Sequence, residues 1–334
     1  MLPPQCARPA ALRGAPRTVP PEPRTTVMTI AQASLSRRLA VLSLAGLAAS
    51  ATLAQNSGYE PQRGQAGKDV IWIPTPDETV TRMLQMAEVQ PTDRVFDLGS
   101  GDGKIAIAAA REFGARATGL EYNADMVGLS NRRAQEAGVA DKVQFRQADI
   151  FQADFSSATV VTMYLLPALN LRLRPLLFKM APGTRVVSHS FTMGDWTPDE
   201  TARAGYGDVY LWHVPANASG NWKLTGAGLP EAALSLAQRY QVVSGDAVFG
   251  ELRASLVRPR IAGPQISFGL RDPKGQLWQF EGRVAGDRIT GMATRPGQAG
   301  VPFEARRTGE ASPIAPTTAA AEQDASAFAA STAR

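Results

Sequence analysis

The segment that most constrains this chain is an apolar stretch that runs directly into closely spaced glycines, Val95-Phe96-Asp97-Leu98-Gly99-Ser100-Gly101-Asp102-Gly103-Lys104. Glycine adopts backbone angles that are closed to other residues and leaves room for a ligand against the main chain. The apolar residues before the glycines predict a buried strand, and the residues after them predict a helix from Lys104 to Phe113. A strand, a glycine turn and a helix in this order are typical of an α/β domain that binds a ligand where the strand ends.

The glycine spacing distinguishes two classes of cofactor. A dinucleotide-binding turn has the pattern G-x-G-x-x-G, whereas here the third glycine, Gly103, comes one residue early and Lys104 takes its place. Asp97 lies just before the turn, where a carboxylate can receive a cationic amino group. The turn therefore favours S-adenosylmethionine, whose amino-acid end carries an ammonium, over NAD.

Two more acidic residues follow the next two predicted strands. Glu121 ends the strand 117–121, where it can accept hydrogen bonds from both hydroxyls of a ribose. Asp149 follows the strand 143–148, where it can accept a hydrogen bond from an adenine amino group. Alone, it is equally well explained as a loop residue or a helix cap. The carboxyl ends of consecutive strands meet at the ligand-binding edge of an open α/β sheet. The predicted cofactor-binding residues are Thr75, Asp97, Gly99, Ser100, Gly101, Gly103, Glu121, Asp149 and Ile150.

Thr75 and Ile150 have their own reasons for inclusion. Thr75 can close over the carboxylate of S-adenosylmethionine, or it can cap the helix predicted to begin near Pro76. Ile150 can pack on the adenine ring.

The pattern along the chain predicts two folded domains. Strand-like and helix-like segments alternate over residues 71–215, which predicts a doubly wound, Rossmann-like sheet, with 209–214 as an antiparallel edge strand. Over residues 216–310, strand-like segments at 234–243, 248–257, 265–270, 276–284 and 288–293 are separated by turn residues. These segments predict a smaller antiparallel β-barrel or β-sandwich. We further expect a linker at 55–70 and a disordered tail at 311–334.

Residues 1–54 predict a leader with an export signal. Arg37-Arg38 precede the apolar run from Leu39 to Leu47, and small residues at 49–54 offer cleavage sites. The arginine pair also resembles a twin-arginine signal. We therefore expect an exported, periplasmic protein. The alternative is an alanine-rich leader on a cytoplasmic enzyme, because S-adenosylmethionine, the expected cofactor, is made in the cytosol.

Charge and residue counts argue against several other kinds of partner and site. Residues 1–40 carry six of the 35 basic residues and one of the 30 acidic residues, so the rest of the chain holds 29 of each. A neutral remainder does not predict a nucleic-acid partner. One cysteine and two histidines argue against a zinc site, and we expect no catalytic metal. The apolar run at 39–47 is short for a membrane span, so we expect none in the mature chain. The sequence leaves the oligomeric state open.

From about Ile71 to Trp196 the chain resembles the class I S-adenosylmethionine-dependent methyltransferases. Within them it is similar to the small lysine methyltransferase family that modifies the ATP synthase c-subunit and the adenine nucleotide translocase. The resemblance is carried by Ile73-Pro74-Thr75-Pro76, the segment from Asp97 to Lys104, Gly119-Leu120-Glu121-Tyr122-Asn123, and Arg185-Val186-Val187 through Phe191 to Asp195-Trp196. The family's usual Cys-Arg-Phe is here His189-Ser190-Phe191. The resemblance implies S-adenosylmethionine as the cofactor and a protein lysine or another amine as the methyl acceptor, and it does not extend to 216–310.

Two residues are candidates for catalysis beside the acceptor. Tyr164 ends the fourth strand, where it can orient the nucleophile or pack under the next helix. His189 ends the fifth strand and can accept a proton, although a lone histidine on an apolar strand is more often a core residue. Methyl transfer is an in-line displacement that depends mainly on positioning, so no dedicated base is required. The competing hypothesis is a non-catalytic, cofactor-binding envelope protein whose β domain carries the main interaction.

Overall fold

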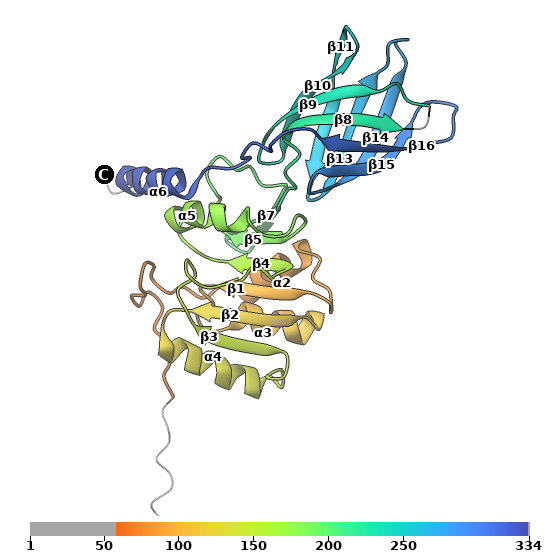
Figure 1. The fold of residues 1–334 in the computed structure, drawn as a ribbon. Coiled ribbons are helices and arrows are strands. Elements are labelled where there is room, and N and C mark those ends of the chain that lie inside the picture. The colour runs from red at the N-terminus through yellow and green to blue at the C-terminus, as the bar shows by residue number, and fades with distance from the viewer. Residues whose placement is uncertain (1–57, 227, 333–334) are drawn as a thin grey trace, which may run out of the picture. The chain divides into compact units, whose positions relative to one another are not determined.

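The computed structural model describes residues 58–226 and 228–332, so the predicted leader at 1–54 lies outside the described residues. The described chain contains a seven-stranded sheet with helices on both faces and a nine-stranded antiparallel sheet (Figure 1). The expected combination of a doubly wound sheet and a following antiparallel β domain is confirmed.

The first sheet has the strand order β3-β2-β1-β4-β5-β7-β6. Strands β1 to β5 are parallel, whereas β7 and β6 run antiparallel. The strands are β1 (Arg94–Leu98), β2 (Arg116–Glu121), β3 (Val143–Gln147), β4 (Val160–Met163), β5 (Arg185–His189), β6 (Glu200–Ala204) and β7 (Gly207–His213). The prediction that β7 is the edge strand is wrong. The tight turn at Gly205-Tyr206 folds β6 back onto its outer side.

Helices cover both faces of this sheet, because strand residues alternate between the faces. Val160 and Val187 pack with α2 and α3 on one face, while Val161 and Val186 pack with α5 on the other. The helices are α2 (Asp77–Met86), α3 (Lys104–Phe113), α4 (Ala124–Glu136) and α5 (Pro167–Leu177). The Asn123 side chain caps α4.

The strand order reverses between β1 and β4. The chain leaves β1 towards β2 and β3 on one side and returns to β4 and β5 on the other. Such a switch point opens a crevice at the carboxyl ends of the strands, where open α/β sheets bind their ligands. The loops that follow β1, β2 and β4 therefore border one site.

The second sheet curls into a nearly closed barrel around its own apolar core. The two strands at its ends are consecutive in the chain and are joined at Leu256, whose N donates to Gly245 O at 2.9 Å. The strands, in chain order, are β8 (Gly220–Gly226), β9 (Ala232–Arg239), β10 (Val242–Phe249), β11 (Leu252–Ser255), β12 (Val257–Ala262), β13 (Gln265–Arg271), β14 (Leu277–Ala285), β15 (Arg288–Thr294) and β16 (Val301–Arg307). The single strand predicted at 234–243 is wrong, because the chain turns at Tyr240, where φ is 54°.

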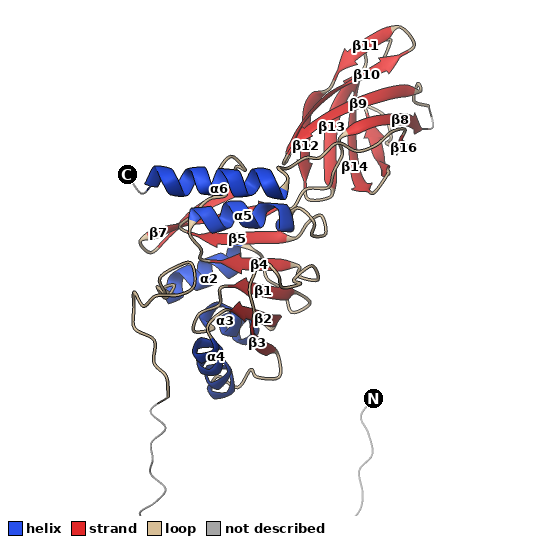
Figure 2. Ribbon diagram, turned by 60° about the vertical axis from the view of Figure 1, so that its left-hand side comes forward, coloured by secondary structure: helices blue, strands red, loops and turns tan. Residues whose placement is uncertain are grey.

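The tail predicted to be disordered contains a helix, α6 (Thr318–Thr332), that packs against α5 (Figure 2). Ala321 and Ala325 are buried, and Asp324 forms an ion pair with the fully buried Arg174 at 2.8 Å. The small side chains that suggested disorder let α6 approach α5 closely, which corrects the prediction.

The predicted linker at 55–70 is also wrong for the part that the structure describes. Residues 65–75, which we call the strap, begin with a hairpin in which Ala66 pairs with Ile71. Gly67 N donates to Val70 O at 2.7 Å, and Trp72 N donates to Gln65 O at 2.9 Å. These backbone bonds give the polar segment a fixed conformation.

Within the described ranges, no helix is both long and apolar enough to cross a membrane. In the same residues, no three His, Cys, Asp or Glu side chains lie close enough together to hold a metal ion.

Candidate functional site

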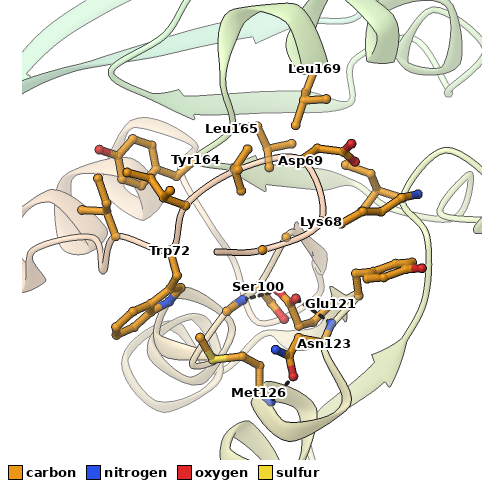
Figure 3. A pocket seen from close by; sticks show the side chains of 18 of the residues that line it. Lys68, Asp69, Trp72, Ser100, Glu121, Asn123, Met126, Tyr164, Leu165 and Leu169 are labelled. Atoms are coloured by element: carbon orange, nitrogen blue, oxygen red, sulfur yellow. Dashed lines mark hydrogen bonds between the residues drawn. The ribbon is translucent and has the colours of Figure 1, made fainter. Parts of the chain in front are cut away.

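A pocket of about 230 Å³ lies at the carboxyl ends of β1, β2 and β4. Figure 3 shows Ser100, Glu121 and Asn123 on one side of it and Tyr164 and Leu165 on another. Every residue of the strap lines the pocket as well. The pocket thus joins the predicted cofactor residues to a segment in which sequence patterns had identified only Thr75.

Asp97 is a buried carboxylate that faces the pocket without a cationic partner. Its side chain is 2% exposed and accepts a hydrogen bond from Thr162 Oγ1 at 2.8 Å. Among the described residues, no Lys or Arg lies within ion-pair distance of it. Burial raises the pKa of Asp97 to about 7. A ligand ammonium at this place would supply the missing positive charge, as expected for the amino-acid end of S-adenosylmethionine.

Ser100 adds a second polar group that lacks a partner. Its Oγ is buried and makes no hydrogen bond with the described residues, although the residue lines the pocket. A buried hydroxyl without a partner costs free energy, so a polar ligand group there would stabilise it.

The glycine turn brings other segments close to the backbone. Gly99 and Gly101 line the pocket with φ of 72° and 52°. A Cβ on Gly101 would lie 2.7 Å from Trp72 Nε1, so the absence of a side chain lets the strap lie against the turn.

Gly103 was also predicted to bind the cofactor, but it is not among the residues that line the pocket. It is the N-cap of α3, with φ of 79°. A Cβ there would lie 2.6 Å from the Phe145 ring and 2.8 Å from Ser130 Cβ. Its role is to let α3 begin close to β3 and α4.

Glu121 lines the pocket at the end of β2, as predicted. Its Oε2 accepts from Gly101 N and its Oε1 accepts from Asn123 N, both at 2.9 Å. These two amides fix the orientation of the carboxylate and tie the glycine turn to the second strand. Each oxygen keeps a further lone pair, which leaves capacity for ribose hydroxyls.

Asp149 and Ile150 also line the pocket, but Asp149 already has an ion partner. Lys68 Nζ of the strap lies 2.8 Å from Asp149 Oδ2, and Phe151 N donates to Asp149 Oδ1 at 2.9 Å. The Lys68 hydrogen bond, together with the Phe151 amide, lowers the pKa of Asp149. Asp149 is therefore ionised at neutral pH and fastens the strap across the pocket.

Thr75 is buried and lines the pocket, where it can meet the carboxylate of the donor. The alternative role as a helix cap is wrong, because the N-cap of α2 is Pro76 and no side chain bonds to that helix end. The strap residues before Thr75 were missed, since a polar segment beside a leader resembles a linker. The apolar run from Val70 to Ile73 is the available signal.

Tyr164 lines the pocket, whereas His189 does not. The two rings are 4.1 Å apart between centroids. His189 is fully buried, neither ring nitrogen has a hydrogen-bond partner, and burial lowers its pKa to about 4. Burial raises the pKa of Tyr164. Both groups are therefore neutral at physiological pH. His189 packs against the Tyr164 ring outside the pocket and does not face an acceptor.

The family model for the ANTKMT methyltransferase domain matches residues 97–200. A protein-lysine N-methyltransferase from Saccharolobus islandicus (strain REY15A) is 41% identical over 151 residues, which cover 43% of this chain and 94% of that protein. The adenine nucleotide translocase lysine N-methyltransferase of Mus musculus is 30% identical over 215 residues, which cover 64% of this chain and 88% of that protein.

Among solved structures, an RNA methyltransferase from Salinibacter ruber in complex with S-adenosyl-L-homocysteine has 55% sequence identity. The match covers 42% of this chain and 94% of that chain, with a TM-score of 0.42.

Proposed function

This chain belongs to the family of methyltransferases with the ANTKMT domain, and we propose that it transfers the methyl group of S-adenosylmethionine to a lysine side chain of a protein. It is an S-adenosylmethionine-dependent enzyme, as the resemblance implied. The observation that carries the lysine acceptor is the 41% identity to a protein-lysine N-methyltransferase over 94% of its length.

The donor half of the pocket supports this chemistry. When bound, S-adenosylmethionine supplies a methyl group on a positively charged sulfur. Asp97 can hold the ammonium and Glu121 the ribose, and the two lie at the ends of the adjacent strands β1 and β2. These contacts would hold the donor at the ends of the two strands and would leave its methyl group available to an acceptor. Positioning of this kind contributes several kcal/mol to an in-line displacement.

Neither of the two candidate catalytic residues is a strong base. Tyr164 is a neutral phenol and His189 a buried, weakly basic imidazole. A lysine amine must lose its proton before it can form the new N–C bond as the S–C bond breaks. We propose that this proton passes to solvent, and that Tyr164 orients the neutral amine.

The experiment uses donor labelled in its methyl group, incubated with the full chain and a cell lysate, followed by peptide mass spectrometry. We expect labelled lysine residues, and we expect Asp97→Asn to abolish the label. Asp141→Asn is the matched control, because Asp141 is exposed on the loop before β3. Label on RNA with none on protein lysine would contradict the proposal.

We also propose that the protein is exported. The support is Arg37-Arg38, the apolar run that follows them and the small residues at 49–54. Mass spectrometry of the N-terminus should find a mature chain that begins between residues 50 and 55. An intact leader on cytoplasmic protein would refute export and favour the cytoplasmic alternative.

A further inference from the structure

The acceptor end of the pocket is aromatic. Tyr164 and Phe191 both line it, at the ends of β4 and β5, with ring centroids 6.2 Å apart and planes inclined by 21°. Neither side chain is among the predicted cofactor-binding residues. Their nearly parallel rings form a wall where a methyl acceptor must enter.

A third aromatic residue, which does not itself line the pocket, lies beyond His189. Tyr206 lies in the turn between β6 and β7, is 60% exposed, and has its ring 6.5 Å from that of His189. His189 in turn contacts Tyr164. Because burial keeps His189 neutral, it does not repel a cation at this place.

The backbone is strained at Ser190, the residue directly before Phe191. Ser190 has φ of 63°, and Phe191 N donates to His189 O at 2.8 Å, which closes a γ-turn of the rare, positive-φ kind. A Cβ on Gly207 would lie 2.8 Å from both His189 Nε2 and Ser190 Oγ, so β7 leaves room for the turn.

Buried polar groups hold this strained turn in place. Ser188 Oγ donates to Phe191 O at 2.7 Å, and Asn170 Nδ2 donates to the same oxygen at 3.3 Å. Ser188 and Asn170 are both fully buried. Strain that the surrounding structure maintains is characteristic of functional sites, and its effect here is to turn Phe191 towards the pocket.

We propose that Tyr164, Phe191 and Tyr206 form a cation-binding site for the acceptor, which takes an alkylammonium group and its methylated forms. The assignment to an acceptor rests on the proposed lysine methylation. Aromatic faces attract ammonium groups without needing N–H donors, so they also hold nitrogens whose hydrogens have been replaced by methyl groups. They further stabilise the positive charge that the amine nitrogen gains during transfer. The strained turn at Ser190 positions Phe191 and is not itself in contact with the acceptor.

The first test compares choline with its uncharged isostere, 3,3-dimethylbutan-1-ol, by ligand-observed NMR on the full chain with S-adenosylhomocysteine. We expect choline to bind about three- to thirtyfold more tightly. Phe191→Leu and Tyr206→Leu should each reduce this preference, whereas Phe328→Leu, an exposed aromatic on α6, should not. Equal binding of the two probes by the wild type would overturn the proposal.

The second test is Ser190→Gly, which removes the strain because glycine tolerates positive φ. We expect a higher melting temperature together with weaker choline binding, since the relaxed turn no longer fixes Phe191. Arg258→Gly is the matched control, because Arg258 also has positive φ, 48°, but lies in the β domain. It should raise the melting temperature and leave choline binding unchanged. If Ser190→Gly does the same, the turn has no positioning role.

The lysine acceptor and the aromatic cation site can each be refuted without the other. A wild-type chain that methylates lysine but shows no preference for choline contradicts the aromatic site alone. A chain that prefers choline yet labels no lysine retains the cation site and contradicts the lysine acceptor.

Discussion

Replacing Asp97 by asparagine should stabilise the fold while it weakens donor binding. Asparagine keeps the oxygen that accepts from Thr162 Oγ1 but carries no charge. Burial raises the pKa of Asp97 from 3.8 to about 7. At pH 8 the ionised carboxylate therefore costs the folded state about 4 kcal/mol.

The gain from Asp97→Asn should depend on pH. Because the folded pKa is raised, the stability that the protonated carboxyl provides is complete below pH 3.8 and is lost as the pH rises through 7. The variant should therefore exceed the wild type by about 4 kcal/mol at pH 8 and by about 2 kcal/mol at pH 5. Urea denaturation at the two pH values measures both differences.

Asp272→Asn is the control with the opposite sign. Burial raises the pKa of Asp272, but hydrogen bonds from Gln276 N, the Trp278 indole and Lys274 N outweigh burial and lower it. The advantage of the wild type over this variant should grow as the pH rises through the acidic range. If Asp97→Asn gave no gain at pH 8, or the same gain at pH 5, burial would not control the Asp97 carboxyl.

Three further predictions concern other parts of the molecule. Glu121→Gln should weaken donor binding about ten- to a hundredfold by calorimetry, since hydrogen bonds to a charged group contribute about 1.5 to 3 kcal/mol; an unchanged affinity would exclude Glu121 from the site. Gly103→Ala should lower the free energy of unfolding, measured by urea denaturation, by about 2 to 4 kcal/mol, because alanine disfavours the positive φ and its Cβ would lie against the Phe145 ring. An unchanged free energy of unfolding would show that the turn is loosely packed. Replacing both Asp195 and Asp324 by alanine should cost about 3 to 5 kcal/mol, because the fully buried Arg174 loses its carboxylate partners; a smaller loss would mean that water reaches this guanidinium.

The elements that carry a strong local signal were predictable. The helix at 104–113 has the predicted bounds, and the predicted strand before the glycines is found at 94–98, because an apolar period and a following glycine are properties of neighbouring residues. Asp97 and Glu121 reach one pocket because parallel strands bring their carboxyl ends to the same edge.

Features that depend on contacts between distant residues were not predictable. The first part of the strap, residues 65–69, is mainly polar and looks like a linker, but Lys68 pairs with Asp149, 81 positions away. The turn at Tyr240 interrupts a continuous β pattern, and the Tyr240 hydroxyl donates to Asp195 Oδ1 at 2.9 Å, outside its own sheet. Gly103 belongs to the glycine pattern, yet its contact with Phe145 is visible only in three dimensions.

The most direct test of the central claim is a calorimetric titration of the full chain with S-adenosylhomocysteine and, separately, with NAD. We predict one S-adenosylhomocysteine site per chain, with weaker binding in Asp97→Asn, and no heat of binding with NAD. Binding of NAD, or the absence of heat with S-adenosylhomocysteine at millimolar concentration, would contradict it.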